Sequence, residues 1–584
     1  MSLNMSSRNK VAKLTCITLM FCSVLRISGI PEEPITCTAT ASTDCTITNS
    51  YGEFADRSIC KAAIALYPAT EQELINAVAS ATKAGAKIKV ATQTSHSIPK
   101  LVCPDGADGW VISTKNLTHI LNVDRSKMEM TVESGVTLQQ LINEAADAGL
   151  ALPYCPYWSG LTVGGMLGTG AHGSSLWGEG SSVHDYVVRA RVVSPGLAAD
   201  GYVKVHDVDS INNLTDLNAV RTNLGVLGIV SQMTFKLQPM FKRSITYLTE
   251  SDSDLADIAA NFGQEHEFAD ITWYASQGKA IYRVDDRVPF STPGDGLFDF
   301  TGFRAQSSLV LGLVRSTEET QEALQFADGK CATATIITFT LLTTAFGLTN
   351  FNDILFTGYP VIGYQNRLQA SSMCLEGEGD NTCPWDPRVK SEYFFQTTFS
   401  VSITKVKSFI QDVQSLLKLV PKSMCGVDTY LGILLRYVKA SNSYLGKEED
   451  SIDFDMTYYR SKDPMIPRMF EDVYEEIEQM GIFKYGALPH WGKNRNLAFI
   501  GAFDKYKNGE EFLKVKARYD PDGYFSSEWT DRMLGLKDGL TVDSDGCALE
   551  GMCICSKDSH CAPKNGYRCM PGRIYTGARV CRKD

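Results

Sequence analysis

The chain has 584 residues, of which 44% are hydrophobic, and a formal net charge of -11. A single hydrophobic core does not extend over this length, so we expect two or more domains. The negative charge and the lack of a basic cluster argue against a nucleic-acid partner, because no surplus of lysine and arginine can neutralise phosphates.

Residues 1–29 have the pattern of a secretory signal peptide. Basic residues within 8–13 precede an apolar run at 14–25, and the small residues Ser28 and Gly29 follow. The run is too short to span a bilayer, and a poorly ordered apolar tail is the alternative. We therefore predict a protein of the secretory pathway, located outside the cell, in the cell wall or in a vacuole. Asn-Leu-Thr glycosylation sequons agree with secretion.

Secretion would place the cysteines in an oxidising compartment. Cys16 and Cys22 leave with the signal peptide, so 15 of the 17 cysteines remain, and this odd number leaves one without a partner. Cys374 and Cys383 enclose a short acidic loop and are predicted to form a local disulfide. Six more lie within 536–584, which we interpret as a disulfide-rich tail whose pairing the sequence does not determine.

Helix and strand signals alternate in the first part of the mature chain. Thr70 is a suitable N-cap for a helix that begins at Glu71, and Gly85 is suited to end it. The sequence "KIKVAT" (87–92) predicts the next strand. A second strand and helix end at Gly149, and further strands follow a glycine-rich segment, so we expect a mixture of helices and strands throughout.

We divide the mature chain into a lead at 30–55, a first domain of two subdomains at 56–245, a second domain at 246–535 and the tail at 536–584. Within the second domain, residues 331–352 carry no charge. Their length suits a membrane helix, but their threonines and glycine favour a buried or interfacial element, so we do not favour membrane association.

A cluster of glycines in "VGGMLGTGAHG" is the first candidate for a binding site. Closely spaced glycines let the backbone approach a ligand and direct N–H groups toward it, which suits a pyrophosphate. The Gly-x-Gly-x-x-Gly spacing alone is weak evidence for a nicotinamide site, because no first βαβ unit with a later acidic residue supports it. A tight connection between packed strands is the alternative. The glycines are Gly164, Gly165, Gly168, Gly170 and Gly173.

His96, one of eight histidines, is the second candidate, because it lies in "TQTSHS" where the predicted strand gives way to a loop. It is either a turn residue that hydrogen-bonds its own backbone or a residue that carries a cofactor. Together, this loop and the glycine segment would be enough to hold a dinucleotide between two subdomains.

The ordered set of motifs resembles the flavin-binding module of the vanillyl-alcohol oxidase superfamily, in its aldonolactone oxidase branch, and is most similar to the plant L-gulono-1,4-lactone oxidase group. The resemblance covers about residues 55–535 and rests on "YPATEQELINAVASATKAGAKIKVATQTSHS", "MTVESGVTLQQLINEAADAGLALP", "LTVGGMLGTGAHGSS", "LGVLGIVSQMTFKLQPMF", "PHWGK" and "YDPDGYF". It implies an α+β fold with a two-subdomain PCMH-type FAD-binding domain, an α+β cap domain and a disulfide-rich tail. The residues it implies for FAD binding are Thr92, Gln93, Thr94, Ser95, His96, Ser97, Gly164, Gly165, Gly168, Thr169, Gly170, His172, Gly173 and Ile229.

The resemblance also implies a covalent bond between His96 and the 8α-methyl carbon of the flavin. Relatives usually have glycines before this histidine, where this chain has Gln93, Thr94 and Ser95. The alternative is a histidine that only lines the site. A second attachment through Cys155, as in some plant flavoproteins of the superfamily, is not favoured because its offset from the glycines differs.

On the substrate side, "PHWGK" resembles the C-terminal motif of the family, which implies that His490 and Lys493 face the flavin. A cation near flavin N1 stabilises the negative charge that reduction places there. The alternative is that His490 packs between domains while Lys493 reaches solvent. Arg436 matches the arginine of the family, but Leu434 stands where a glutamate is expected, so either the base or the substrate differs.

Pro156 aligns roughly with the position at which a small residue admits O2 in this family. Because proline is larger than glycine and rigid, we expect O2 to be a poor acceptor and another electron acceptor to be used. The resemblance implies FAD-dependent oxidation of a small sugar lactone at its C2 hydroxyl, with L-gulono-1,4-lactone the simplest substrate and ascorbate the final product. An alditol or other carbohydrate oxidase is one alternative, and an inactive wall-associated binding protein is another. We predict no metal site.

Overall fold

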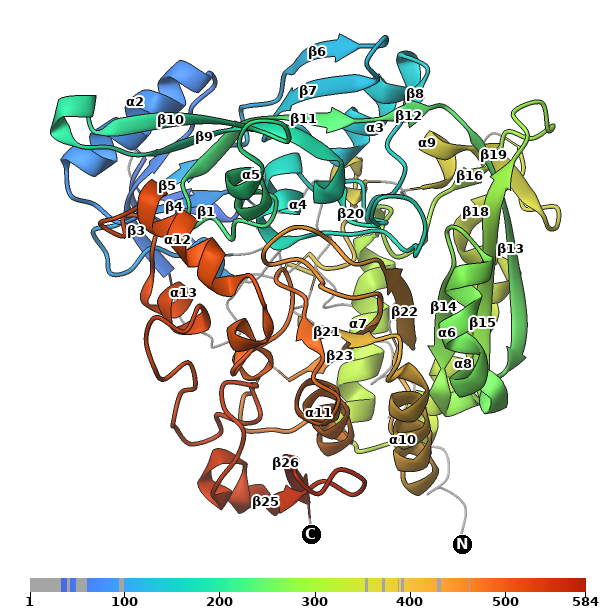
Figure 1. Cartoon of the computed structure of the whole chain (residues 1–584). Helices are drawn as coiled ribbons and strands as arrows, with labels where there is room; N and C mark the ends of the chain where they lie inside the picture. Colours follow the sequence, from blue (N-terminus) through green and yellow to red (C-terminus); the bar gives the residue numbers. More distant parts are fainter. Residues whose placement is uncertain are drawn as a thin grey trace, which may run out of the picture.

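The computed structural model is an α+β protein in which the tail packs at the end of the molecule opposite the first domain (Figure 1). The predicted α+β class is confirmed. The predicted signal peptide and the loop 94–98, which contains His96, lie outside the described residues. The structure describes residues 33–38, 42–48, 60–93, 99–351, 355–369, 373–386, 388–389, 393–427, 432–461 and 463–583.

The first sheet has the strand order β1 (Ile35–Cys37), β2 (Thr43–Ile47), β3 (Cys60–Leu66), β5 (Trp110–Ser113) and β4 (Ile88–Ala91). Both β3 and β4 run parallel to β5, and α2 (Glu71–Lys83) is the crossover between them. As predicted, Thr70 caps this helix by accepting a hydrogen bond from the Glu73 N–H, and Gly85 follows it with a φ of 70°.

The second sheet is antiparallel, in the order β10 (Val203–Asp209), β9 (Val187–Pro195), β11 (Ile229–Lys236), β7 (Glu129–Glu133) and β6 (Ile120–Asp124). Its buried side chains share one core with the helices α3 (Leu138–Asp147), α4 (Val163–Thr169) and α5 (Leu214–Val220). The glycine segment is thus partly a helix, α4, although glycine disfavours helices. Thr162 caps it, and a Cβ atom on Gly164 would lie 3.0 Å from that of Ser134, so the glycines permit close packing.

The cap domain is built on an antiparallel sheet of eight strands in the order β19 (Val361–Tyr364), β13 (Lys242–Ser251), β15 (Lys279–Val288), β14 (Asp270–Tyr274), β22 (Ile433–Val438), β23 (Ser451–Arg460), β21 (Tyr393–Ser402) and β24 (Leu488–Pro489). One face is covered by α6 (Leu255–Glu265), α10 (Val406–Leu419) and α11 (Glu471–Gln479). Side chains alternate along β22, so Leu435 and Tyr437 lie in this core while Leu434 and Arg436 lie on the other face. That second face is directed toward the first domain and forms the wall of a cavity.

The uncharged segment lies largely in α8 (Ala327–Thr343), beside α7 (Ser308–Ala323). Five of its threonines donate to carbonyl groups four residues earlier, as Thr335 does to Cys331, so these hydroxyl groups are satisfied within the helical segment. Ala334 is buried and Phe339 is exposed, and Cys331 is bonded to Cys425 of the following segment. Among the described residues, no helix is both long enough and apolar enough to cross a membrane.

Short elements complete the first domain and the cap. They are β8 (Leu150–Ala151) paired with β12 (Gln238–Pro239), β16 (Leu297–Phe298) with β18 (Leu348–Thr349), β17 (Gln306–Ser307) with β20 (Asn381–Thr382), and the single-turn helix α9 (Gln365–Leu368).

After the cap, the chain returns to the first domain through α12 (Gly509–Tyr519) and α13 (Glu528–Met533). The Ile88 N–H donates to the Tyr524 carbonyl at 2.8 Å, and Lys89 Nζ donates to the Phe525 carbonyl at 2.8 Å. Residues more than 400 positions apart in sequence therefore hold the cap against the first sheet.

The cysteine-rich tail ends in the hairpin β25 (Tyr567–Pro571) and β26 (Arg579–Lys583), which packs on α11 of the cap. Glu476 of α11 accepts hydrogen bonds from the backbone N–H groups of Arg573, Ile574 and Tyr575 at 2.7, 2.6 and 2.9 Å. The tail is therefore attached to the cap domain.

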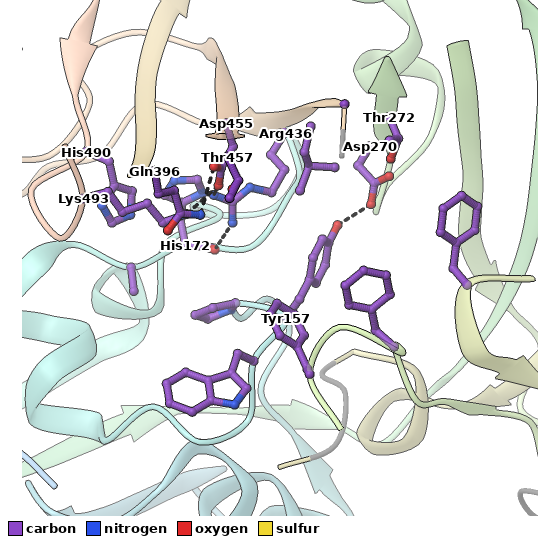
Figure 2. A pocket seen from close by; sticks show the side chains of 18 of the residues that line it. Tyr157, His172, Asp270, Thr272, Gln396, Arg436, Asp455, Thr457, His490 and Lys493 are labelled. Carbon is purple, nitrogen blue, oxygen red and sulfur yellow. Dashed lines mark hydrogen bonds and ion pairs between the residues drawn. The ribbon is translucent and has the colours of Figure 1, made fainter. Parts of the chain in front are cut away.

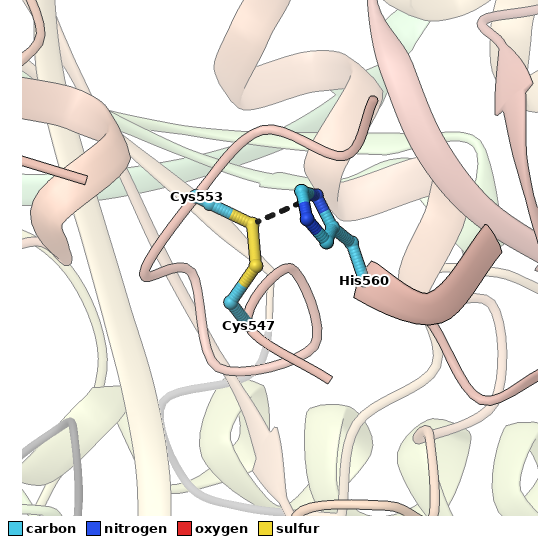
Figure 3. A group of neighbouring side chains, drawn as sticks. All are labelled: Cys547, Cys553 and His560. Carbon is cyan, nitrogen blue, oxygen red and sulfur yellow. Dashed lines mark hydrogen bonds between the residues drawn. A yellow bond between two sulfur atoms is a disulfide. The ribbon is translucent and has the colours of Figure 1, made fainter. Parts of the chain in front are cut away.

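The predicted disulfide Cys374–Cys383 is confirmed, and among the cysteines that the structure describes Cys155 alone is unpaired. In the tail, His560 lies against the Cys547–Cys553 disulfide, with Nδ1 3.6 Å from the Cys553 sulfur (Figure 3). Because these sulfur atoms are bonded to each other, neither is available as a thiolate ligand for a metal. The other disulfides are Cys37–Cys45, Cys60–Cys103, Cys331–Cys425, Cys555–Cys569 and Cys561–Cys581.

Candidate active site and cofactor cradle

A narrow cavity of about 90 Å³, which we call the cradle, opens where the end of β4, the start of α4 and the loop before β11 meet. A Cβ atom on Gly165 would lie 3.4 Å from Thr92 Cγ2, which shows how closely the two predicted segments approach each other. Thr92, directly after β4, and the first glycines of the glycine segment therefore line one space. Its lining includes the predicted cofactor residues Thr92, Gly164, Gly165, Gly168, Thr169 and Ile229.

The cavity suits the phosphates of a dinucleotide. Ser134 lines it, and the buried Oγ atom of this serine has no hydrogen-bond partner among the described residues. A buried hydroxyl without a partner is unfavourable, and phosphate oxygens would accept its hydrogen bond. Asn223 Oδ1 accepts a hydrogen bond from the Gly225 N–H at 2.8 Å, which holds this glycine at a φ of 65° beside the cavity. The residues present therefore fit a pyrophosphate group.

Some predicted cofactor residues lie elsewhere in the described structure. Gly170 ends α4 in the left-handed conformation, with a φ of 66°. Gly173 packs against the backbone of Cys155, where a Cβ atom would lie 2.9 Å from the carbonyl oxygen. Gln93 is exposed, and residues 94–97 lie outside the described residues. A role in FAD binding for these positions stays a prediction.

A larger cavity of about 220 Å³, which we call the chamber, lies between the first domain and the face of the cap sheet that carries Leu434 and Arg436 (Figure 2). Thr169, the last residue of α4, lines both cavities, so the two cavities are adjacent there. The structure brings the predicted substrate-side residues together here, although they come from distant parts of the chain. The predicted residues in its lining are Pro156, Thr169, His172, Leu434, Arg436, His490 and Lys493.

A carboxylate that the sequence did not single out lies at the centre of the polar wall. Lys493 Nζ donates to Asp455 Oδ2 at 2.5 Å, Arg436 Nη2 lies 3.4 Å from the same oxygen, and Gln396 Nε2 donates to Oδ1 at 3.0 Å (Figure 2). Burial alone would raise the pKa of Asp455, but Lys493 and Arg436 outweigh burial and hold this pKa below its ordinary value. Lys493 is therefore ion-paired and does not simply reach solvent.

Two donor groups on this wall are directed by their neighbours. The Gly492 N–H donates to His490 Nδ1 at 3.0 Å, so the neutral ring of His490 carries its proton on Nε2. Burial, with His172 and Lys493 nearby, lowers the pKa of His490 well below its ordinary value. Arg436 Nε is buried without a hydrogen-bond partner in the part of the chain that the structure describes. The Nε2–H of His490 and the Nε–H of Arg436 are therefore available to donate to a ligand.

His172 connects the glycine segment to the cap sheet. Its Nε2 lies 2.7 Å from Asp453 Oδ2 and its Nδ1 lies 2.8 Å from the Gly173 carbonyl oxygen. Ser400 donates to the other oxygen of Asp453, which is fully buried. Both partners are acceptors, and a neutral imidazole has a single N–H, so His172 donates to one of them at a time; its contact with Asp453 links β23 to the segment that follows α4.

A second polar group in the chamber was also missed. Tyr157 donates its hydroxyl proton to Asp270, and Arg283 lies 3.5 Å from the same carboxylate oxygen. Burial, opposed by Arg283 and Tyr157, raises the pKa of Asp270. The signal for Asp270 and Asp455 was the polar residue at every second position of β14 and β23, which a core strand would not carry. The far end of the chamber is aromatic and is lined by Trp158, Phe298, Phe300, Phe303, Phe346 and Trp385.

Cys155 lines neither the cradle nor the chamber. It is buried beside Arg243, and burial raises the pKa of its thiol to about 12. The thiol is therefore protonated under ordinary conditions, and nothing in the described structure supports a second flavin attachment at this residue.

The comparison with known proteins decides the family. The chain is 59% identical over 558 residues to L-gulonolactone oxidase 5 of Arabidopsis thaliana, covering 95% of this chain and 94% of that protein. It is 57% identical over 581 residues to L-gulonolactone oxidase 2 of the same plant, covering 99% and 98%. The chain belongs to the plant L-gulonolactone oxidase family.

Three family models match parts of this member of the L-gulonolactone oxidase family. Residues 62–198 match an FAD binding domain, residues 390–533 match D-arabinono-1,4-lactone oxidase, and residues 544–583 match the C-terminal domain of L-gulonolactone oxidase 2-like proteins. In fold, the chain is similar to a solvent-stable cholesterol oxidase, with a TM-score of 0.63 at 15% identity, covering 86% of this chain and 98% of that chain. The predicted PCMH-type architecture is confirmed, and the chain is an FAD-dependent oxidoreductase acting on CH–OH groups.

Proposed function

We propose that this enzyme oxidises an aldono-1,4-lactone at its C2 hydroxyl group, with L-gulono-1,4-lactone as the simplest substrate and ascorbate as the rearranged product. The observation that carries this proposal is that the two cavities share Thr169, so that a dinucleotide cradle lies beside a chamber with a polar wall of Arg436, Asp455 and Lys493. The names of the plant relatives and the lactone oxidase model over residues 390–533 support the substrate class.

Bound FAD supplies the two-electron acceptor for the hydrogen at C2. The side chains of the chamber bind and orient the sugar. Arg436 Nε and His490 Nε2 are donors that suit the hydroxyl and carbonyl oxygens of a lactone, and Lys493 adds a positive charge where reduction makes the site more negative. The aromatic end excludes water from the chamber, which strengthens these polar interactions.

The cofactor would lie along the cradle, with its phosphates near Gly164, Gly165 and Ser134. We retain the prediction that His96, which follows Thr92 by four residues, is bonded covalently to the flavin. A visible spectrum before and after acid precipitation tests attachment, because a tethered flavin stays with the pellet. Peptide mass spectrometry should then find the added mass of FAD on the peptide that contains His96, and an unmodified peptide would exclude it.

Location and electron acceptor follow from separate features. Seven disulfides agree with folding in an oxidising compartment, and with the predicted signal peptide they support passage through the secretory pathway. Pro156 lines the chamber, which supports restricted access of O2 and the use of another acceptor. Oxygen consumption as fast as dye reduction at saturating substrate would contradict this restriction.

Initial rates of dye reduction by purified holoenzyme test the substrate class. We expect a higher kcat/KM for L-gulono-1,4-lactone than for alditols or free sugars of the same size. A preference for alditols would make the enzyme an alditol oxidase with the same cradle. A colourless protein that takes up no FAD would favour an inactive, wall-associated role.

A further inference from the structure

The chamber must supply an acceptor for the proton of the substrate hydroxyl, and the expected position of that acceptor is occupied by a hydrocarbon. Leu434 of β22 lines the chamber two residues before Arg436, where the resemblance predicts a glutamate. Oxidation of an alcohol removes a hydride from carbon and a proton from oxygen, so loss of this carboxylate leaves the proton without an acceptor at that position.

Three carboxylates in the described residues lie on or next to this wall. Asp453 is fully buried, is bonded to His172 and Ser400, and does not line the chamber. Asp270 lines it beside Tyr157, and its register partner is Arg436. Asp455 lines it too, and its register partner is Leu434 itself.

Register places Asp455 one strand away from the missing glutamate. Residues directly opposite each other in an antiparallel pair have side chains on the same face, with Cβ atoms roughly 5 Å apart. The carboxylate of Asp455 therefore projects into the chamber beside the position that a glutamate at 434 would occupy. It also contacts Arg436, which matches the arginine of the family, and Lys493, which the resemblance places against the flavin.

We infer that Asp455 has taken over the role of the missing glutamate and accepts the proton of the C2 hydroxyl group. This inference rests on the proposed function. In the reaction, the O–H bond of the C2 hydroxyl group breaks and its proton passes to an oxygen of Asp455. The C2–H bond breaks as well, and FAD held in the cradle would be the acceptor of the hydride with its electron pair. The C2–O bond becomes a carbonyl group, so atoms and electrons balance.

The carboxylate of Asp455 can accept one more hydrogen bond, from the substrate. An ionised carboxylate accepts about four hydrogen bonds. Lys493 and Arg436 approach Oδ2, and Gln396 donates to Oδ1. One acceptor position therefore remains on Oδ1, next to Thr457 and the open chamber (Figure 2). Lys493 and Arg436 lower the pKa of Asp455 and so favour its ionised form, which is the form that accepts a hydrogen bond.

Equilibrium binding separates this role from general support of the fold. With the flavin reduced in advance and oxygen excluded, the enzyme binds a lactone without oxidising it. We expect wild-type enzyme to bind L-gulono-1,4-lactone about tenfold more tightly than its 2-deoxy analogue, because the analogue lacks the hydrogen bond to a charged group. Asp455→Asn should abolish this preference, and Asp270→Asn should keep it. The opposite result for the two variants would overturn the assignment.

Turnover and a matched pair of double variants complete the test. Asp455→Asn should lower kcat by about a hundredfold at full FAD content, since general-base catalysis contributes this much or more. Leu434→Glu combined with Asp455→Asn returns a carboxylate to β22 and should be faster than Leu434→Gln combined with Asp455→Asn, which matches it in size but not in charge. Equal rates in the two double variants would contradict the inference.

Two experimental outcomes distinguish an error in the proposed function from an error in the role of Asp455. Wild-type enzyme that neither binds nor oxidises an aldonolactone would remove the proposed function and this assignment with it. Wild-type enzyme that oxidises the lactone, with Asp455→Asn equally fast, would remove the assignment alone.

Discussion

Glu476 fixes the tail to the cap, and its replacement by glutamine should release the tail locally. The carboxylate is fully buried and accepts hydrogen bonds from three successive backbone N–H groups, at 2.7 Å from Arg573, 2.6 Å from Ile574 and 2.9 Å from Tyr575. Glutamine keeps one acceptor oxygen but directs an N–H₂ group toward the remaining N–H, and the charge is lost. One unsatisfied buried donor and two weakened bonds together cost about 3 kcal/mol.

A local cost of this size makes opening of the tail about a hundredfold more frequent. Hydrogen exchange of the amides at 573–575 measures it directly, and we expect their protection in Glu476→Gln to fall by about this factor. Glu510→Gln, at an exposed position of α12, is the control and should leave protection unchanged. Equal protection in Glu476→Gln and wild type would refute the reasoning that these three bonds hold the tail.

Three further predictions concern stability, cofactor and acceptor. Burial, opposed by Arg468, raises the pKa of Glu471 from 4.5 to about 8. The stability that this group contributes is therefore complete below pH 4.5 and is lost as the pH rises through about 8. Glu471→Gln should flatten the fall of Tm over this pH range, and parallel curves of Tm against pH for the variant and wild type would contradict this. A Cβ atom on Gly492 would lie 3.0 Å from Thr169 Oγ1, so Gly492→Ala should lower the FAD content measured by absorbance. A full FAD content in this variant would count against binding of the flavin beside Thr169. Pro156→Gly should raise the rate of oxygen consumption severalfold relative to dye reduction, and an unchanged ratio would show that Pro156 does not restrict O2.

Local signals in the sequence predicted the local structure well. The cap residue Thr70, the helix that follows it, the end at Gly85 and the strand at 88–91 agree with the structure because each depends on neighbours in the chain. The helix α4 was not foreseen, because its glycines oppose helix formation, and the contact that requires Gly164 is with Ser134, 30 residues earlier.

Only some residues of the chamber could be predicted from the sequence. Motifs identified Arg436, His490 and Lys493, and the structure places all three on one chamber. Asp455 belongs to no motif, and its importance comes from cross-strand register with Leu434 and from its ion pairs, which the order of residues along one strand does not reveal. The aromatic end of the chamber is likewise assembled from segments far apart in the chain.

Anaerobic mixing of purified holoenzyme with L-gulono-1,4-lactone tests most directly whether the cradle and the chamber act as one catalytic site. We expect the visible flavin band to bleach on addition of the lactone and to return when an electron acceptor is supplied. A flavin band that no aldonolactone bleaches would contradict it.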